Sequence, residues 1–176
     1  MIEDEYPQKI TKLQAAERQL REAIYLFISL RDSVSVHTLA GAAHQILEDL
    51  CKSKSLKGPI QSKLINENYQ KVWKQAMRDP MNFFKHADSD PNGIVTFKSE
   101  FTQFVLFDAI YMYEQLSEAS FSEIDVYKTW FATKFPGVLG DENLEKVWIE
   151  AKERTGLSHT DYKVFQDMLN EKASKN

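Results

Sequence analysis

Asn82 and His86 have residue types and a spacing that suit acid/base chemistry. Side chains four residues apart lie on one face of a helix, and a histidine can accept or donate a proton near neutral pH. Arg78 precedes them in the sequence. We therefore take Asn82, His86 and Arg78 as a candidate catalytic set. The structural alternative is a hydrogen-bonded pair, Asn82 with His86, packed beneath the acidic loop that follows.

The same pair resembles the motif of the HEPN superfamily, a group of small all-α proteins associated with nucleic acids. Its ribonuclease members carry an arginine, then Asn, Asp or His, and then a histidine on one helix. The resemblance implies metal-independent RNA cleavage or RNA binding, with His86 as the acid/base, Asn82 orienting it, and Arg78 or Arg31 facing the phosphate. Here Met81 stands where that family has its arginine. A second match, Arg31 and Asp32 followed by His37, has the family's spacing but crosses an expected helix break at residues 33–35.

The loop that begins at Asp88 resembles the first half of an EF-hand calcium loop. Asp88, Asp90 and Asn92 place oxygen atoms at alternate positions, and Gly93 occupies the place of the turn glycine. The closing glutamate falls one place late, at Glu100. Two interpretations stay open: a degenerate divalent-metal (calcium) site at 88–100 with Asp88, Asp90 and Asn92 as ligands, or an acidic turn that separates two helices.

A further group follows helical steps of three and four residues: His37, Gly41, His44 and Glu48. We expect His37, His44 and Glu48 to form a polar surface opposite the apolar side of their helix. His44 and Glu48 are four apart, which suits metal ligation or a plain hydrogen bond. Glycine costs helix stability relative to alanine, so Gly41 predicts close approach by another element, such as the first helix or a partner chain.

Helical periodicity dominates the elements that must position these residues. The pattern predicts an all-α fold, an irregular bundle of about six to eight helices in a single domain spanning 1–176, with 1–7 and 172–176 frayed. In the first half of the chain, helices are expected at 8–30, at 36–52 with Ser33 or Ser35 as the cap, and through 64–77, followed by a short helix capped by Asp79 and started by Pro80. A strongly hydrophobic central helix is expected over 100–116, with an aromatic series of Phe101, Phe104, Phe107 and Tyr111. The last three expected helices are one opened by a Ser120/Glu123 capping box, one at 141–155 closed by Gly156, and one at 159–171. Residues 94–97 are the one short extended segment expected.

Composition narrows the function classes. The net charge is −4, so RNA is not favoured as a partner. Cys51 is the only cysteine, which rules out an intramolecular disulfide and a zinc site built on paired thiolates. The longest apolar run, at 23–30, is too short to span a bilayer. We expect a cytoplasmic protein that needs no cofactor and does not enter a membrane.

The phrases HTLAGAAHQIL at 37–47 and NFFKHADSDP at 82–91 resemble a group of small bacterial all-α proteins of uncharacterised function. That resemblance implies an all-α fold and no activity. No glycine-rich phosphate loop or nucleophile elbow occurs in the sequence. The leading hypothesis is a non-enzymatic helical interaction or self-assembly module with a protein partner or a homodimer as its complex. The HEPN-like ribonuclease and the calcium-binding protein are the alternatives.

Overall fold

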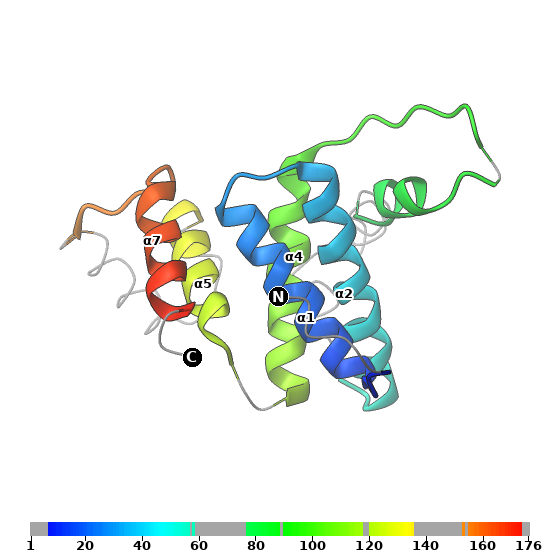
Figure 1. Cartoon of the computed structure of the whole chain (residues 1–176), viewed down its shortest axis with the longest axis horizontal. Helices are drawn as coiled ribbons and strands as arrows, with labels where there is room; N and C mark the ends of the chain where they lie inside the picture. Colours follow the sequence, from blue (N-terminus) through cyan, green and yellow to red (C-terminus); the bar gives the residue numbers. More distant parts are fainter. Residues whose placement is uncertain are drawn as a thin grey trace.

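The computed structural model describes residues 7–56, 58, 77–88, 90–117, 120–135, 153 and 155–173. All regular structure in these ranges is helical, which confirms the predicted all-α bundle (Figure 1). The predicted helix through 64–77 and most of the one at 141–155 lie outside the described residues. None of the described helices combines the length and the apolar character that crossing a membrane requires.

An antiparallel hairpin of α1 (Lys12–Ile28) and α2 (Ser33–Ser53) forms one side of the bundle (Figure 1). α1 begins four residues later than predicted because Thr11 and Gln14 form a capping box, which satisfies the free amides there. The cap of α2 is Asp32, whose Oδ2 accepts a hydrogen bond from the Ser35 amide at 2.7 Å. The predicted caps, Ser33 and Ser35, are therefore wrong, and the helix starts earlier than expected.

The turn between these helices places a leucine in the left-handed region. Leu30 has φ 54°. The Arg31 amide donates to the Leu26 carbonyl and the Leu30 amide to the Phe27 carbonyl, which is the Schellman arrangement that closes a helix. Glycine normally occupies this position because a side chain there is strained. The chain thus reverses at Leu30 without the sequence signal that usually marks such a turn.

The hydrophobic helix α4 (Thr102–Ser117) lies at the centre, as predicted, behind the hairpin in Figure 1. A 3-10 turn, η2 (Ser99–Phe101), leads into it. Its side chain Phe107 stacks on Phe131 of α5 at 4.4 Å between ring centroids. Tyr111 departs from the predicted aromatic core because its side chain is exposed.

The last two described helices, α5 (Ser122–Lys134) and α7 (Tyr162–Ala173), pack together and against α1. The predicted capping box fails because Phe121, not Ser120, is the N-cap and makes no side-chain cap, while Glu123 pairs with Arg21 on α1 at 2.8 Å. Gly156 has a positive φ of 67°, consistent with the predicted helix stop. α7 begins three residues later than predicted.

Residues 77–85 are helical, and Asp79 and Pro80 lie inside that helix. The predicted cap at Asp79 and helix start at Pro80 are therefore wrong. After the helix ends, residues 86–88 lead away from the bundle and residues 90–98 return to the start of α4 (Figure 1). Residues 94–97 have no regular structure, so the predicted extended piece does not become a strand within the chain.

Candidate functional site

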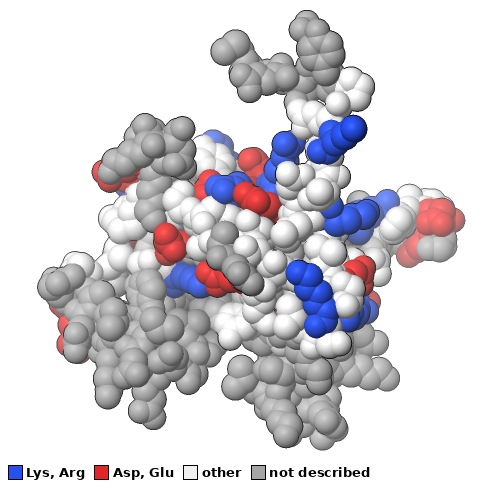
Figure 2. Space-filling model, turned by 90° about the horizontal axis from the view of Figure 1, so that it is seen from below, with Lys and Arg blue, Asp and Glu red and all other residues white. Residues whose placement is uncertain are grey.

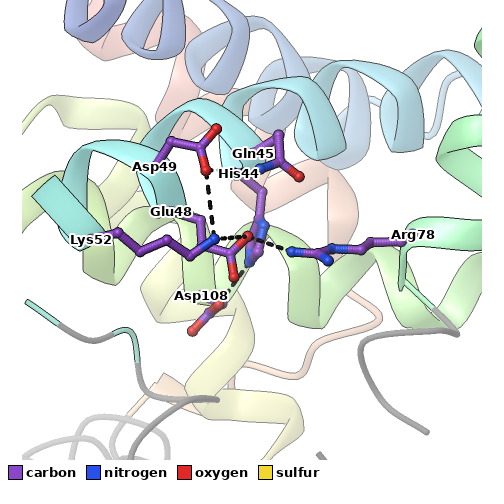
Figure 3. Close-up of polar contacts among 7 residues, drawn as sticks. All are labelled: His44, Gln45, Glu48, Asp49, Lys52, Arg78 and Asp108. Carbon is purple, nitrogen blue, oxygen red and sulfur yellow. Dashed lines mark hydrogen bonds and ion pairs between the residues drawn. The ribbon is translucent and has the colours of Figure 1, made fainter. Parts of the chain in front are cut away.

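Charged side chains gather where the helix at 77–85 meets α2 and α4. We call this group the polar cluster; its members are His44, Glu48, Lys52, Arg78 and Asp108 (Figure 3). The three elements bring together residues that are up to 64 positions apart in sequence. Two contacts organise the cluster, one around each buried carboxylate.

Glu48 is the first buried carboxylate, and its side chain is only 4% exposed. Arg78 Nη2 donates to Glu48 Oε2 at 2.6 Å, and Lys52 Nζ lies 3.3 Å from the same oxygen. Burial raises the pKa of Glu48, but the charge and hydrogen bond of Arg78 and the charges of Lys52 and His44 outweigh burial and hold the pKa below its usual value. Glu48 is therefore a buried anion held by two cations, and the prediction that it lies on a polar surface is wrong.

Asp108 is the second buried carboxylate, with a side chain 2% exposed on the apolar helix α4. His44 Nε2 lies 2.7 Å from Asp108 Oδ2, and the imidazole is 14% exposed. His44 and Glu48 share the helix spacing predicted for metal ligands, yet each is bound to a different partner. Within the described ranges, no group of three or more His, Cys, Asp or Glu side chains is placed to hold a metal ion.

His37 is fully buried, so its predicted place on a polar surface is also wrong. Its Nε2 lies 3.1 Å from the Met77 carbonyl and its Nδ1 2.9 Å from Thr102 Oγ1. Because a carbonyl only accepts, Nε2 carries the hydrogen and Nδ1 accepts from the Thr102 hydroxyl. Burial lowers the pKa of His37 below its usual value of 6.5, and the bond to Met77 opposes this only in part. The neutral ring fastens the helix at 77–85 to α2 and α4.

Gly41 allows the close approach that its position predicted. A Cβ at this glycine would lie 2.5 Å from Met81 Sδ and 2.8 Å from Met81 Cγ. The approaching element is the helix at 77–85, rather than the first helix or a partner chain. Met81 is buried, so the residue that stands in the place of the HEPN arginine acts here as an apolar packing residue.

The candidate catalytic set is divided between two environments. Asn82 and His86 are exposed, and the His86 amide donates to the Asn82 carbonyl at 3.1 Å in the last turn of their helix. Arg78 belongs to the polar cluster through Glu48. In the second match, Asp32 caps α2 while His37 lies buried farther along it. The HEPN assignment stays a prediction.

The acidic loop forms an exposed turn. The Gly93 amide donates to the Asp90 carbonyl at 3.2 Å, and a Cβ added to Gly93 would collide with Asp90 Oδ2, so the carboxylate of Asp90 folds over the glycine. Asp88 and Asn92 are also exposed, and Glu100 lies in the 3-10 turn that leads into α4. Calcium binding by Asp88, Asp90 and Asn92 stays a prediction.

The segment that follows the turn is exposed on alternate residues. Ile94 is 96% exposed, Thr96 and Lys98 are exposed, and Val95 and Phe97 are half-buried. From Ile94 to Phe97, neither the amides nor the carbonyls form a backbone hydrogen bond within the part of the chain that the structure describes. The segment therefore offers unpaired backbone in the described part of the chain, and we call residues 94–98 the free edge.

Aromatic packing holds the C-terminal part of this segment, at Phe97. Phe97 lies 5.0 Å from the His37 ring and 5.1 Å from the Phe84 ring, both in edge-to-face contact. Such pairs are a favourable arrangement of aromatic rings. The returning end of the segment is thus fixed to the buried histidine, while Ile94 projects into solvent.

Sequence reasoning missed two members of the polar cluster, Asp108 and Lys52, and it did not predict the pairing of Arg78 with Glu48. The signal for Asp108 was present, because a carboxylate in the most apolar helix of a bundle needs a buried partner. Comparison with family models, with curated proteins and with solved structures finds no match for this chain.

Proposed function

We propose that this protein is a non-enzymatic helical interaction module that pairs with a second copy of itself through residues 94–98. The observation that carries the proposal is the unpaired backbone from Ile94 to Phe97 among the described residues, together with the exposure of Ile94. Exposed backbone that has no partner can pair with a strand from another chain.

The side chains of the edge suit strand pairing. Ile94, Val95 and Thr96 are β-branched and Phe97 is aromatic, and these residue types favour extended structure. An antiparallel pair centred on Thr96 sets Thr96 against its equivalent and Val95 against Phe97 of the second copy. Contacts between β-branched and aromatic residues across strands are favourable, as are threonine pairs. The same sequence therefore complements itself about a two-fold axis.

Three of the polar groups that the sequence singled out are engaged in holding the fold, whereas Asn82 and His86 are exposed. Arg78 neutralises Glu48, His44 contacts Asp108, and His37 joins the helix at 77–85 to α2 and α4. On the face shown in Figure 2, basic side chains share the surface with acidic ones. A nucleic acid is bound mainly through clustered positive charge, so this face supports a protein partner more than RNA.

The test is sedimentation equilibrium over a range of protein concentrations. A two-stranded pair is marginal alone, so we expect a dimer with a Kd between about 1 μM and 1 mM. Neighbouring amides in a strand point to opposite edges. Replacing Val95 and Thr96 by proline, one at a time, therefore removes a donor from each edge in turn, and at least one of the two variants should be monomeric.

The matched control is Thr96→Val, which keeps both the amide and the branched side chain and should dimerise like the wild type. Far-UV circular dichroism verifies that each variant keeps the helical fold. A wild type that stays monomeric at about 1 mM, or proline variants that both dimerise like the wild type, would contradict the proposal.

The ribonuclease alternative is tested separately by incubating the purified protein with RNA in EDTA, beside a His86→Ala variant. His86 is exposed, so its removal should leave the fold intact. We expect no cleavage by either protein. Cleavage that the wild type performs and His86→Ala loses would overturn the non-enzymatic assignment.

A further inference from the structure

A cavity of about 330 Å³ is lined by residues from the end of α1, the start of α2, the start of α4, the end of α5 and the start of α7, and these helix ends lie at the top of the view in Figure 1. It is bounded by the α1–α2 turn, the start of α4, the end of α5 and the start of α7. Binding sites for small molecules are commonly clefts of this size, lined by apolar groups with a few polar ones. Four separate segments of the chain thus build one concave surface.

Two cations line this cavity, Arg31 from the turn and Lys134 from the end of α5. Lys134 Nζ donates to Gln103 Oε1 at 2.7 Å and lies 5.1 Å from the centroid of the Trp130 ring. Neither cation has a carboxylate within 4.0 Å in the described part of the chain, whereas several other cations of these helices do. Glu100 lines the same cavity, so the lining carries one net positive charge.

The lysine is held in a partly desolvated position. Burial lowers the pKa of Lys134 below its usual value of 10.5, and the charge of Glu100 opposes this shift. A cation that has lost part of its hydration without gaining a carboxylate is left with electrostatic capacity for an anion. Arg31 adds a planar fork of donors, which matches a carboxylate.

Part of the remaining lining is suited to an apolar body, beside the polar side chains of Ser33, Ser99, Thr102 and Gln103. Phe27, Leu30 and Val36 contribute carbon surface, and Tyr162 contributes a ring that carries one hydroxyl. Leu30 is 62% exposed and is held at a positive φ by the turn hydrogen bonds. An exposed leucine in a strained turn at the rim of the cavity would gain contacts if a ligand covered it.

We propose that this cavity binds a small amphipathic monocarboxylate, with the anionic group between Arg31 and Lys134 and the apolar body against Phe27 and Leu30. The single negative charge matches the net charge of the lining. No residue of the free edge at 94–98 lines the cavity, so the site would bind its ligand in a monomer or a dimer.

The experiment titrates ¹⁵N-labelled protein with sodium octanoate and follows the amide resonances by NMR. The resonances of Ser33, Ser99 and Tyr162, which line the cavity, should shift in a saturable way. 1-Octanol, which has the chain without the charge, and inorganic phosphate, which has charge without the chain, should each bind more weakly by about tenfold. Equal binding of either probe would overturn the assigned ligand class.

Two variants test the charges. Arg31→Gln should weaken octanoate binding by about fivefold or more, since it removes a charge-assisted hydrogen bond. Lys134→Met should do the same while keeping a side chain that packs on Trp130, with melting temperature as the check on folding. The matched control is Arg18→Gln, an exposed arginine on α1 about 14 Å along the helix from Phe27, which should bind like the wild type. Shifts that do not saturate, or equal affinities for Arg31→Gln and Arg18→Gln, would overturn the proposal.

Discussion

Removing Arg78 from the polar cluster should destabilise the fold in a pH-dependent way. The variant Arg78→Gln leaves Glu48, whose side chain is 4% exposed, with Lys52 at 3.3 Å as the nearest cation that remains among the described residues. Breaking a fully buried ion pair costs about 3 to 5 kcal/mol. Arg78 is 44% exposed and Lys52 remains in place, so we expect a smaller loss, about 1.5 to 3 kcal/mol of unfolding free energy at pH 7.

The dependence on pH follows from the lowered pKa of Glu48. A carboxylate whose folded-state pKa lies below its usual value of 4.5 contributes stability that is fully present above pH 4.5 and is lost as the pH falls through the lowered pKa. Arg78→Gln removes most of this contribution. The gap in stability between the wild type and the variant should therefore be widest near neutral pH and should narrow in acid.

The assay is urea unfolding followed by far-UV circular dichroism at several pH values. The matched control is Lys163→Gln, which breaks an exposed pair with Asp167 whose atoms lie 2.7 Å apart. Exposed pairs contribute little, so the control should lose less than about 0.5 kcal/mol. A loss for Arg78→Gln no larger than the control's, or one that does not narrow in acid, would refute the role given to this ion pair.

Three further predictions concern packing, turn geometry and the buried histidine. Gly41→Ala should destabilise the wild type, because the added Cβ would lie 2.5 Å from Met81 Sδ. In a Met81→Ala protein the same substitution should raise the free energy of unfolding by about 1 kcal/mol through helix propensity. Additive effects of the two substitutions in urea unfolding would contradict the contact. Leu30→Gly should raise the free energy of unfolding by about 0.5 to 1 kcal/mol, because it relieves the positive φ. This gain is smaller than the full strain energy because glycine is more flexible in the unfolded chain. Ser55→Gly, at φ 58°, should have the same effect, and a loss of stability in both variants would show that the turns are not strained. The lowered pKa of His37 keeps its ring neutral in the folded protein, so below pH 6.5 the wild type should lose stability with a slope of up to about 1.4 kcal/mol per pH unit. His37→Gln should lack this loss when melting is followed as a function of pH. Identical dependence of melting on pH in both proteins would contradict the role given to His37.

Helical periodicity was enough to predict the class of fold and the central place of α4, because the spacing of apolar residues directly reports the buried face of a helix. Helix ends were harder. Leu30 and Ser55 close α1 and α2 in the left-handed region without a glycine to signal the turn. Asp32 is the N-cap of α2, although Ser33 and Ser35 beside it could also cap a helix, so the sequence alone did not identify the cap.

The candidate site was predictable in membership more than in arrangement. Spacing put His37, His44 and Glu48 on one helix face, but it could not show that this face is covered by the helix at 77–85. Gly41 held the only hint, since a glycine within a helix predicts a close neighbour. In the folded protein these three polar residues are covered: His37 contacts the Met77 carbonyl, His44 contacts Asp108, and Glu48 pairs with Arg78. Tertiary packing therefore decided which polar residues lie inside.

The most direct measurement of the central proposal is amide hydrogen exchange at residues 94–98 as a function of protein concentration. Within one copy the amides from Ile94 to Phe97 make no backbone hydrogen bond among the described residues, and the segment arcs away from the bundle (Figure 1). If two copies pair through this edge, amides on one side of the strand should become protected as the dimer forms, while the helix at 77–85 should exchange at an unchanged rate. Fast exchange of all these amides at every concentration, in a protein shown to dimerise, would place the interface elsewhere and contradict the account.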